Sequence, residues 1–326
     1  MPLQSSELQK PCIVVVGPTA SGKSDLAQEI ALALGGVVLS ADSMQIYKGM
    51  DIGTGKILPH EMKVAHYGLD LVNPGQAFSA AVFQEYGRGV IDNFNDNGKT
   101  CVVCGGTGFY IRALIDEFDF PAGEQIGNPI RDKWNAFLEV HGAHELWLEL
   151  NKVDPASAEV IHENDSKRVV RAFELLADGT SYRAQKEAFS EIPQRYPALF
   201  IGLKVTPAIL NARIDRRVDK MIAAGLVDEV KTLLRQGFRE GLTAQQAIGY
   251  KEIVAYLEGD CSLDEAIVQI KTATHRYAKR QRTWFRKDAR IQWLDADEYD
   301  LARLTQESLR LYDEYLVAHT AEEGLK

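Results

Sequence analysis

A glycine-rich loop near the amino end has the residue types and spacing of a phosphate-binding site. Gly17-Pro-Thr-Ala-Ser-Gly-Lys-Ser24 matches the P-loop pattern, G-x-x-x-x-G-K-[ST], in full. In such loops, backbone N–H groups and the start of the next helix point at phosphate oxygens. Lys23 would neutralise phosphate charge, and Ser24 could ligate Mg²⁺. The predicted phosphate-binding residues are Gly17, Pro18, Thr19, Ala20, Ser21, Gly22, Lys23 and Ser24.

A P-loop leaves the fate of the phosphates open. Many nucleotide-binding P-loop proteins hold Mg²⁺ with an aspartate after a second hydrophobic strand. Here the apolar run 100–104 ends in Gly105-Gly-Thr107 without a carboxylate, which argues against an ordinary ATPase. Asp42 instead closes the run 37–41, so we expect it at the carboxyl edge of a sheet, near the P-loop. It could act as a general base, a Mg²⁺ ligand, or only a turn or helix-cap residue.

The elements that must position these residues alternate along the chain. Apolar, β-branched runs predict buried strands, and helical stretches between them predict a parallel sheet covered on both faces. The fold class is therefore α/β, a P-loop NTPase-like core flanked by helices. The expected strands are 11–17, 37–42, 100–104, 199–205 and 291–294.

The interval 124–193 breaks this alternation. It has helical patterning at 130–140, 143–150, 155–161 and 166–176, and no convincing strand. We expect an all-α insertion domain at 125–193, within a core made of 1–124 and 194–326. After the fourth strand the chain is expected to stay helical over 207–287, with breaks at Gly225, Gly237, Gly241 and Gly259.

Composition points to a protein of a reducing compartment. Four scattered cysteines in 326 residues do not make a disulfide framework. Cys101 and Cys104 form a C-x-x-C, but on a strand they would point to opposite faces, so we expect core positions. Residues 1–10 lack the pattern of an export signal, and no run reaches the roughly 18 apolar residues of a membrane span. A cytoplasmic protein without a membrane partner is expected.

Charge is unevenly distributed. The net charge is -9, yet the interval 271–290 holds eight Lys or Arg against Asp288. Such a patch on an acidic protein predicts either a local polyanion site or a solvated helix face. Basic residues beside Trp284 and Phe285 suit RNA binding, although at least one of these aromatics should belong to the core.

Six stretches together resemble the tRNA dimethylallyltransferases of bacterial type. The likeness runs from about residue 12 to residue 294, and it is specific because it extends well beyond the P-loop. The stretches are Gly17 to Ser24, Ala41-Asp-Ser-Met-Gln-Ile-Tyr-Lys-Gly-Met-Asp-Ile-Gly-Thr-Gly-Lys56, Gly105-Gly-Thr-Gly-Phe-Tyr110, His162-Glu-Asn-Asp-Ser-Lys-Arg168, Gln246-Ala-Ile-Gly-Tyr-Lys251 and Lys279-Arg-Gln-Arg-Thr-Trp-Phe-Arg286.

The resemblance implies transfer of a dimethylallyl group from dimethylallyl diphosphate to N6 of the adenosine 3′ of the tRNA anticodon. The P-loop would then hold a leaving diphosphate together with Mg²⁺ at Ser24. By the same resemblance the catalytic residues are Asp42, as the general base, and Thr19 and Arg217, which are set around the diphosphate and the reacting centre. Without the resemblance, Arg217 in its charged helical run would pass for a solvated residue, and Thr107 for a simple loop threonine.

The resemblance also implies a tRNA surface and a monomer. A base in the anticodon stem-loop must leave its stack to reach the site, which is cheapest in a single-stranded loop. The implied tRNA-binding residues are Asp42, Ser43, Met44, Gln45, Thr107, Arg131, Lys167, Arg168, Val169, Val170, Arg171, Lys279, Arg280 and Gln281.

Three other functions remain open from the sequence. A small-molecule kinase using ATP would explain the P-loop and Asp42, but not the basic interval 271–290. An enzyme that prenylates free adenine nucleotides would not need Lys167 to Arg171. An RNA-binding module without catalysis would not need Asp42.

Overall fold

The computed structural model describes residues 10–120, 128–241 and 243–323. The chain divides into two compact units, which are Met1–Ile115 with Gln194–Lys326, and Asp116–Pro193. The predicted start of the insertion, at 124/125, lies outside the described residues, as do residues 1–9 of the interval that lacks the pattern of an export signal.

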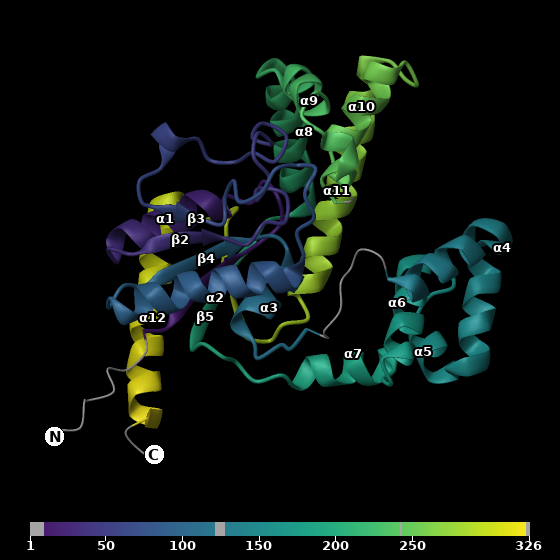
Figure 1. The fold of residues 1–326 in the computed structure, drawn as a ribbon. Helices are drawn as coiled ribbons and strands as arrows, with labels where there is room; N and C mark the ends of the chain where they lie inside the picture. Colours follow the sequence, from purple (N-terminus) through teal and green to yellow (C-terminus); the bar gives the residue numbers. More distant parts are fainter. Residues whose placement is uncertain (1–9, 121–127, 242, 324–326) are drawn as a thin grey trace. The chain divides into compact units, whose positions relative to one another are not determined.

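The first unit is built on one parallel sheet with the strand order β3-β2-β4-β1-β5-β6 (Figure 1). Apolar, largely β-branched residues fill its central strands, where both faces are covered. The α/β fold class expected from the sequence is confirmed. The strands are β1 (Cys12–Val16), β2 (Val37–Ser40), β3 (His66–Tyr67), β4 (Cys101–Gly105), β5 (Ala198–Lys204) and β6 (Ile291–Asp295).

One strand differs from the sequence expectation. β3 pairs with β2 at the sheet edge through Val38 opposite His66 and Leu39 opposite Tyr67. A strand of two residues carries no alternating or apolar run, so local pattern could not reveal it.

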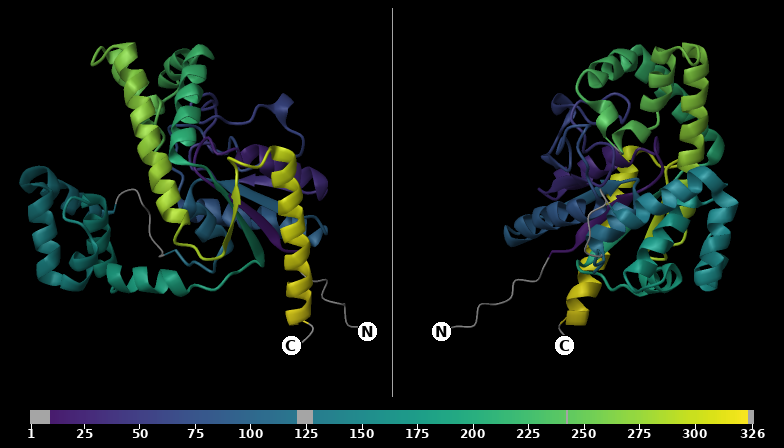
Figure 2. Two further views of the ribbon diagram at one scale, coloured as in Figure 1. Left: turned by 180° about the vertical axis from the view of Figure 1, so that it is seen from behind. Right: turned by 45° about the vertical axis from the view of Figure 1, so that its right-hand side comes forward.

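Alternate residues of the strands feed two hydrophobic clusters, one on each face of the sheet. One face packs Val14 and Val103 against α2 and α3. The other packs Ile13 and Val15 against α1, α8 and the later helices. Figure 2 shows from behind how α12 runs along the strands. The helices of this unit are α1 (Lys23–Ala33), α2 (Ala80–Asp96), α3 (Gly108–Ile115), α8 (Pro207–Ala223), α9 (Leu226–Leu234), α10 (Tyr250–Glu258), α11 (Leu263–Phe285) and α12 (Leu301–Glu323), with 3₁₀ turns η1 (Pro59–Glu61), η2 (Phe238–Glu240) and η3 (Ala244–Gln246).

Local signals explain where these helices begin and end. The side chain of Ser79 accepts the Val82 amide before α2, and Ser262 with Glu265 forms a capping box before α11. The predicted breaks Gly225, Gly237 and Gly259 all have positive φ at helix ends.

The second unit has a hydrophobic core of its own. Leu146, Leu150, Val169 and Phe173 pack together inside it. Its helices match the predicted ranges closely except for α7, whose mostly polar sequence gave little apolar pattern. They are α4 (Pro129–Val153, kinked at Gly142), α5 (Pro155–Val160), α6 (Ser166–Ala177) and α7 (Tyr182–Glu191).

Candidate functional site

Three loops meet at the carboxyl edge of the sheet. Val16 lies opposite Gly105 in the β1–β4 pair, and Ser40 lies opposite Cys104 in the β2–β4 pair. The loops that follow these strands therefore leave the sheet side by side. This edge of an open parallel sheet is where α/β proteins bind their ligands.

The first loop is the predicted P-loop, which leads from β1 into α1. Gly22 has φ 92°, a left-handed conformation that favours glycine, and α1 begins at Lys23. The Lys23 ammonium donates to the Pro18 carbonyl at 3.4 Å. The Ser21 hydroxyl is buried, and within the described chain it has no hydrogen-bond partner. The loop therefore has the shape and the polar groups of an anion cradle.

The charges of Lys23, Asp42 and Arg217 act on one another at this edge. Burial lowers the pKa of Lys23 below its ordinary value, Arg217 adds to the lowering, and Asp42 opposes it. Burial also lowers the pKa of Arg217, and Asp42 again opposes the shift. The structure thus brings together three predicted site residues from β1–α1, the loop after β2, and α8.

The second loop holds Asp42 in a turn. Its Oδ1 accepts the Met44 amide at 2.9 Å, so Asp42 does stabilise a turn, as one reading of the sequence proposed. The Ser43 amide donates to Oγ1 of Thr107 at 3.2 Å, which ties this loop to the third loop, between β4 and α3. Asp42, Ser43 and Thr107 therefore lie together.

Arg217 is held from the second loop and is not merely a solvated charge. Its Nη2 donates to the Thr54 carbonyl at 3.1 Å. Gly55 has φ 59°, and a side chain there would collide with the guanidinium. The left-handed conformation favours glycine, and the lack of a side chain permits this close approach.

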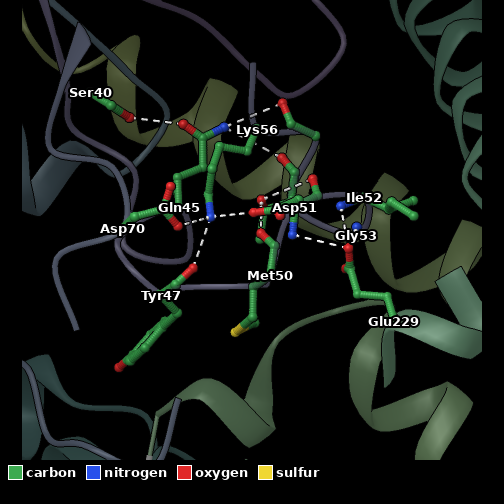
Figure 3. Close-up of polar contacts among 12 residues, drawn as sticks. Ser40, Gln45, Tyr47, Met50, Asp51, Ile52, Gly53, Lys56, Asp70 and Glu229 are labelled. Carbon is green, nitrogen blue, oxygen red and sulfur yellow. Dashed lines mark hydrogen bonds and ion pairs between the residues drawn. The ribbon is translucent and has the colours of Figure 1, made fainter. Parts of the chain in front are cut away.

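Two polar clusters fix the stretch 45–56 (Figure 3). Lys56 is buried, and its ammonium donates to Asp51 at 2.5 Å, Asp70 at 2.6 Å and the Tyr47 carbonyl at 2.8 Å. Gln45 links the start of the stretch to Ser40, whose hydroxyl donates to its Oε1 at 2.9 Å. The first cluster closes the stretch around a buried cation.

The second cluster anchors the same stretch to the helices behind it. The Glu229 carboxylate accepts the amides of Asp51, Ile52 and Gly53, at 3.2, 2.8 and 3.2 Å. The Tyr250 hydroxyl donates to Glu229 at 2.6 Å. The residues before Thr54 are therefore held by α9 and α10, and Thr54 in turn contacts Arg217.

The predicted tRNA residues of the second unit are of two kinds. Lys167 and Arg168 are exposed in the first turn of α6, and Arg168 pairs with Asp165 at 2.5 Å. An open hollow of about 490 Å³ is lined by His162, Asn164, Asp165, Ser166 and Lys167. Val169 and Val170 are buried in the core, so their side chains face inward.

Arg131 and Arg171 are already paired. Glu174, whose side chain is 1% exposed, accepts from Arg131 Nε at 2.5 Å and from Arg171 at 2.7 Å. Burial alone would raise the pKa of Glu174, but hydrogen bonds from the two arginines outweigh it and hold the pKa below its ordinary value. These arginines have a structural role whether or not they also contact RNA.

The basic interval around α11 divides in a similar way. Lys279 and Arg280 are exposed, whereas Gln281 and Phe285 are buried. Lys271 pairs with Asp219, and Arg290 pairs with Asp288. The expectation that one of the two aromatics is a core residue is confirmed for Phe285, while Trp284 is 40% exposed.

Other expectations concern metals, cysteines and membranes. Cys101 and Cys104 pack into the clusters on opposite faces of the sheet, as expected, and both are free thiols. Among residues 10–120, 128–241 and 243–323, no group of three or more His, Cys, Asp or Glu could hold a metal ion. No helix in the same ranges is both long and apolar enough to cross a membrane.

Sequence reasoning missed Glu229, Tyr250 and Lys56 as parts of the site. Tyr250 and Lys56 lie inside stretches that carry the family resemblance, which was the one available signal. Glu229 lies in an ordinary amphipathic helix, and only the folded chain brings it to the amides of 51–53.

A parallel sheet with a P-loop between its central strand and α1 defines the class, a P-loop NTPase-like α/β protein. Two family models match this chain, IPP transferase over residues 45–288 and isopentenyl transferase over residues 11–67. The chain belongs to the IPP transferase family, and it is a prenyltransferase.

Relatives agree over most of the chain. It is 46% identical to a tRNA dimethylallyltransferase of Carboxydothermus hydrogenoformans, covering 90% of this chain and 94% of the relative. It is 44% identical to one of Bacillus pumilus, covering 88% and 90%.

Solved structures show the same fold. A tRNA isopentenylpyrophosphate transferase of Bacillus halodurans superposes with TM-score 0.72 at 36% identity, covering 96% of this chain and 99% of that one. A eukaryotic dimethylallyltransferase acting on tRNA superposes with TM-score 0.78 at 29% identity, covering 95% and 80%.

Proposed function

We propose that the chain transfers a dimethylallyl group from dimethylallyl diphosphate to N6 of the adenosine immediately 3′ of the tRNA anticodon. The observation that carries the proposal is that the loops bearing Lys23 and Asp42 leave the same edge of the sheet, and that Arg217 donates to the Thr54 carbonyl of the second of these loops. The names of the relatives, tRNA dimethylallyltransferases, support the donor group and the acceptor.

The reaction needs a cation-rich cradle for the leaving group. As the C–O bond of the allylic donor breaks, negative charge grows on the departing diphosphate. Positive charge there comes from Lys23, Arg217 and the amides of the P-loop, to which Thr19 belongs. Because these groups are fixed before the substrate arrives, little reorganisation is needed during bond breaking.

The acceptor amine needs a base. The adenine N6 is a poor nucleophile because its lone pair is delocalised into the ring, so proton removal should accompany formation of the N6–C bond. Asp42 is the proposed acceptor of that proton. The Met44 amide fixes one of its carboxylate oxygens, which orients the second.

Mg²⁺ is the proposed cofactor, and the residues present fit it. Mg²⁺ in such sites is held by few protein groups together with substrate phosphates and water. Ser24, exposed in the first turn of α1, is the proposed protein ligand, and the same loop holds the buried Ser21 hydroxyl, which has no hydrogen-bond partner in the described chain. When bound, the ion would supply further positive charge to the diphosphate.

Exposed basic residues are the proposed tRNA contacts. Lys167 and Arg168 in the second unit, and Lys279 and Arg280 in the first, would bind phosphates and give salt-dependent affinity. Trp284, exposed beside the last two, offers a stacking surface for an unpaired base.

Mass spectrometry of nucleosides tests the proposal directly. Unmodified tRNA, incubated with the protein, Mg²⁺ and dimethylallyl diphosphate, should gain one five-carbon adduct on the adenosine 3′ of the anticodon. Free AMP should remain unmodified, and ATP should not be consumed. Modification of AMP alone, or consumption of ATP without an adduct, would support a rival function instead.

Asp42→Asn tests the role of the base. Turnover should fall by roughly two orders of magnitude or more, while tRNA binding is retained. Asp96→Asn, at the exposed end of α2, is the matched control and should leave turnover unchanged. Unchanged turnover in Asp42→Asn would remove Asp42 from catalysis.

A further inference from the structure

Gln281 is a buried amide between two loops of the site. Its side chain lies on α11 and is only 5% exposed. Its Oε1 accepts the Thr19 amide at 2.9 Å, and its Nε2 donates to the Gly106 carbonyl at 3.0 Å. Because one neighbour is a donor and the other an acceptor, only a side chain with both functions satisfies them.

The two loops joined by Gln281 face the two proposed substrates. Thr19 belongs to the P-loop, which would hold the donor diphosphate. Gly106 precedes Thr107, whose hydroxyl accepts the Ser43 amide next to Asp42. A side chain at Gly106 would collide with the Gln281 amide, so the glycine permits this close approach. The amide thus links the donor side of the site to the acceptor side.

One face of α11 makes all of these contacts. Tyr277, four residues before Gln281, neighbours Thr107, and burial raises its pKa to about 12, with the charge of Asp42 acting the same way. Trp284, three residues after, packs close to Gly108. Spacings of three and four residues place these side chains on one side of the helix. Lys279 and Arg280 are exposed, so the basic stretch has a structural face and a solvent face.

We propose that Gln281 is a positioning residue for the transfer, rather than a tRNA contact. It fixes the separation between the P-loop and the Gly106-Thr107 loop, and hence the separation between the allylic carbon and the acceptor amine. This inference rests on the proposed function. Displacement of reacting groups by about 1 Å is enough to slow a reaction on the order of a hundredfold.

Two substitutions of similar size separate the two hydrogen bonds. Gln281→Met removes both, whereas Gln281→Glu keeps an acceptor for Thr19 and sets an oxygen against the Gly106 carbonyl. With both substrates saturating, kcat should fall roughly 10- to 100-fold in each variant. The tRNA dissociation constant, measured by gel shift, should change less than about twofold, since Gln281 is buried. Gln269→Met and Gln269→Glu, at an exposed position of the same helix, are the matched controls and should retain wild-type kcat.

A substitution in the opposite loop tests the same inference independently, in case the Gln281 variants do not fold. Gly106→Ala pushes on the amide from the opposite loop and should also lower kcat while sparing tRNA affinity; thermal melts identify any unfolded variant. Unchanged kcat in folded Gln281→Met, or a loss of tRNA affinity with kcat intact, would overturn the inference. If the wild-type protein forms no five-carbon adduct, the proposed function fails first. If the wild-type protein forms the adduct and Lys23→Ala weakens donor binding, but the Gln281 variants keep wild-type kcat, then the positioning role is wrong while the proposed function stands.

Discussion

The sheet edge and the α6 surface use positive charge in opposite ways. At the sheet edge Lys23 and Arg217 are partly enclosed, and each is held by a backbone carbonyl, of Pro18 and of Thr54. On α6, Lys167 is exposed, and the exposed Arg168 pairs with the neighbouring Asp165. An enclosed cation is held in the position where a small anionic ligand binds. An exposed cation can contact a large polyanion that no cavity could enclose.

The comparison extends to the carboxylates that neutralise these regions. Glu229 fixes the backbone beside Arg217, so it shapes the site without neutralising the arginine directly. Glu174 binds Arg131 and Arg171 directly and is itself buried. Acidic residues therefore position the site in one unit and stabilise the fold in the other.

Lys23→Ala should have the largest effect, because it removes the charge closest to the proposed diphosphate. The KM for dimethylallyl diphosphate should rise roughly 100-fold, as expected for loss of a charge-assisted contact. Steady-state kinetics with tRNA saturating measure this. The exposed Lys99→Ala should behave as wild type, and an unaltered KM in Lys23→Ala would contradict the assigned cradle.

Tyr250→Phe tests whether enclosure of Arg217 depends on the Glu229 anchor. Loss of the hydroxyl should loosen the amides of 51–53 and let the Thr54 carbonyl move, lowering kcat/KM roughly 10-fold. In the double variant with Arg217→Ala, the second substitution should add little, since both act through one group. Fully additive losses would show that Tyr250 acts elsewhere; Tyr256→Phe, in the same helix, is the control.

Lys167→Glu combined with Arg168→Glu tests the exposed region. The tRNA dissociation constant should rise roughly 10-fold, and the slope of its logarithm against the logarithm of salt should flatten by about 1 to 2. Gel shifts at several salt concentrations measure both, with exposed Lys186→Glu as the control. If affinity and slope both hold, tRNA does not bind this end of α6.

Glu174→Gln should have the smallest effect on activity and act mainly on stability. The second unit should lose roughly 1–3 kcal/mol of unfolding free energy, because two partly buried arginines lose their anion. Fluorescence of Trp134 and Trp147, both in that unit, follows its unfolding. The exposed pair Arg183–Glu187 supplies the control, and Glu187→Gln should change stability by less than about 0.5 kcal/mol.

The Glu174 carboxylate and its two arginines also predict that the stability of the second unit depends on pH. The pKa of Glu174 is lowered in the folded protein, so its contribution is complete above the ordinary glutamate pKa, about 4.3, and is lost as pH falls through the lower folded value. The stability difference between wild type and Glu174→Gln should therefore shrink in acid. A difference that stays constant from pH 7 to pH 3 would mean that the carboxylate is not what stabilises the unit.

Local sequence was enough for the main elements and for the P-loop. A buried strand such as Cys12–Val16 is a run of apolar residues, and the loop after it has a fixed pattern. Both can therefore be recognised from residues that are adjacent in the sequence. The helix breaks at Gly225, Gly237 and Gly259 are equally local. The two-residue strand β3 is not, because it exists only through its pairing with β2.

The sequence by itself determined which residue types line the carboxyl edge, including Lys23, Asp42 and Thr107. Only the tertiary structure decided which of the many other polar residues support them. Gln281 joins Thr19 and Gly106 across separations of 262 and 175 residues. Glu229 reaches the amides of 51–53 across a comparable separation. The physical reason is that hydrogen-bond partners and burial depend on distance in space, whereas local pattern reports only on neighbours along the chain.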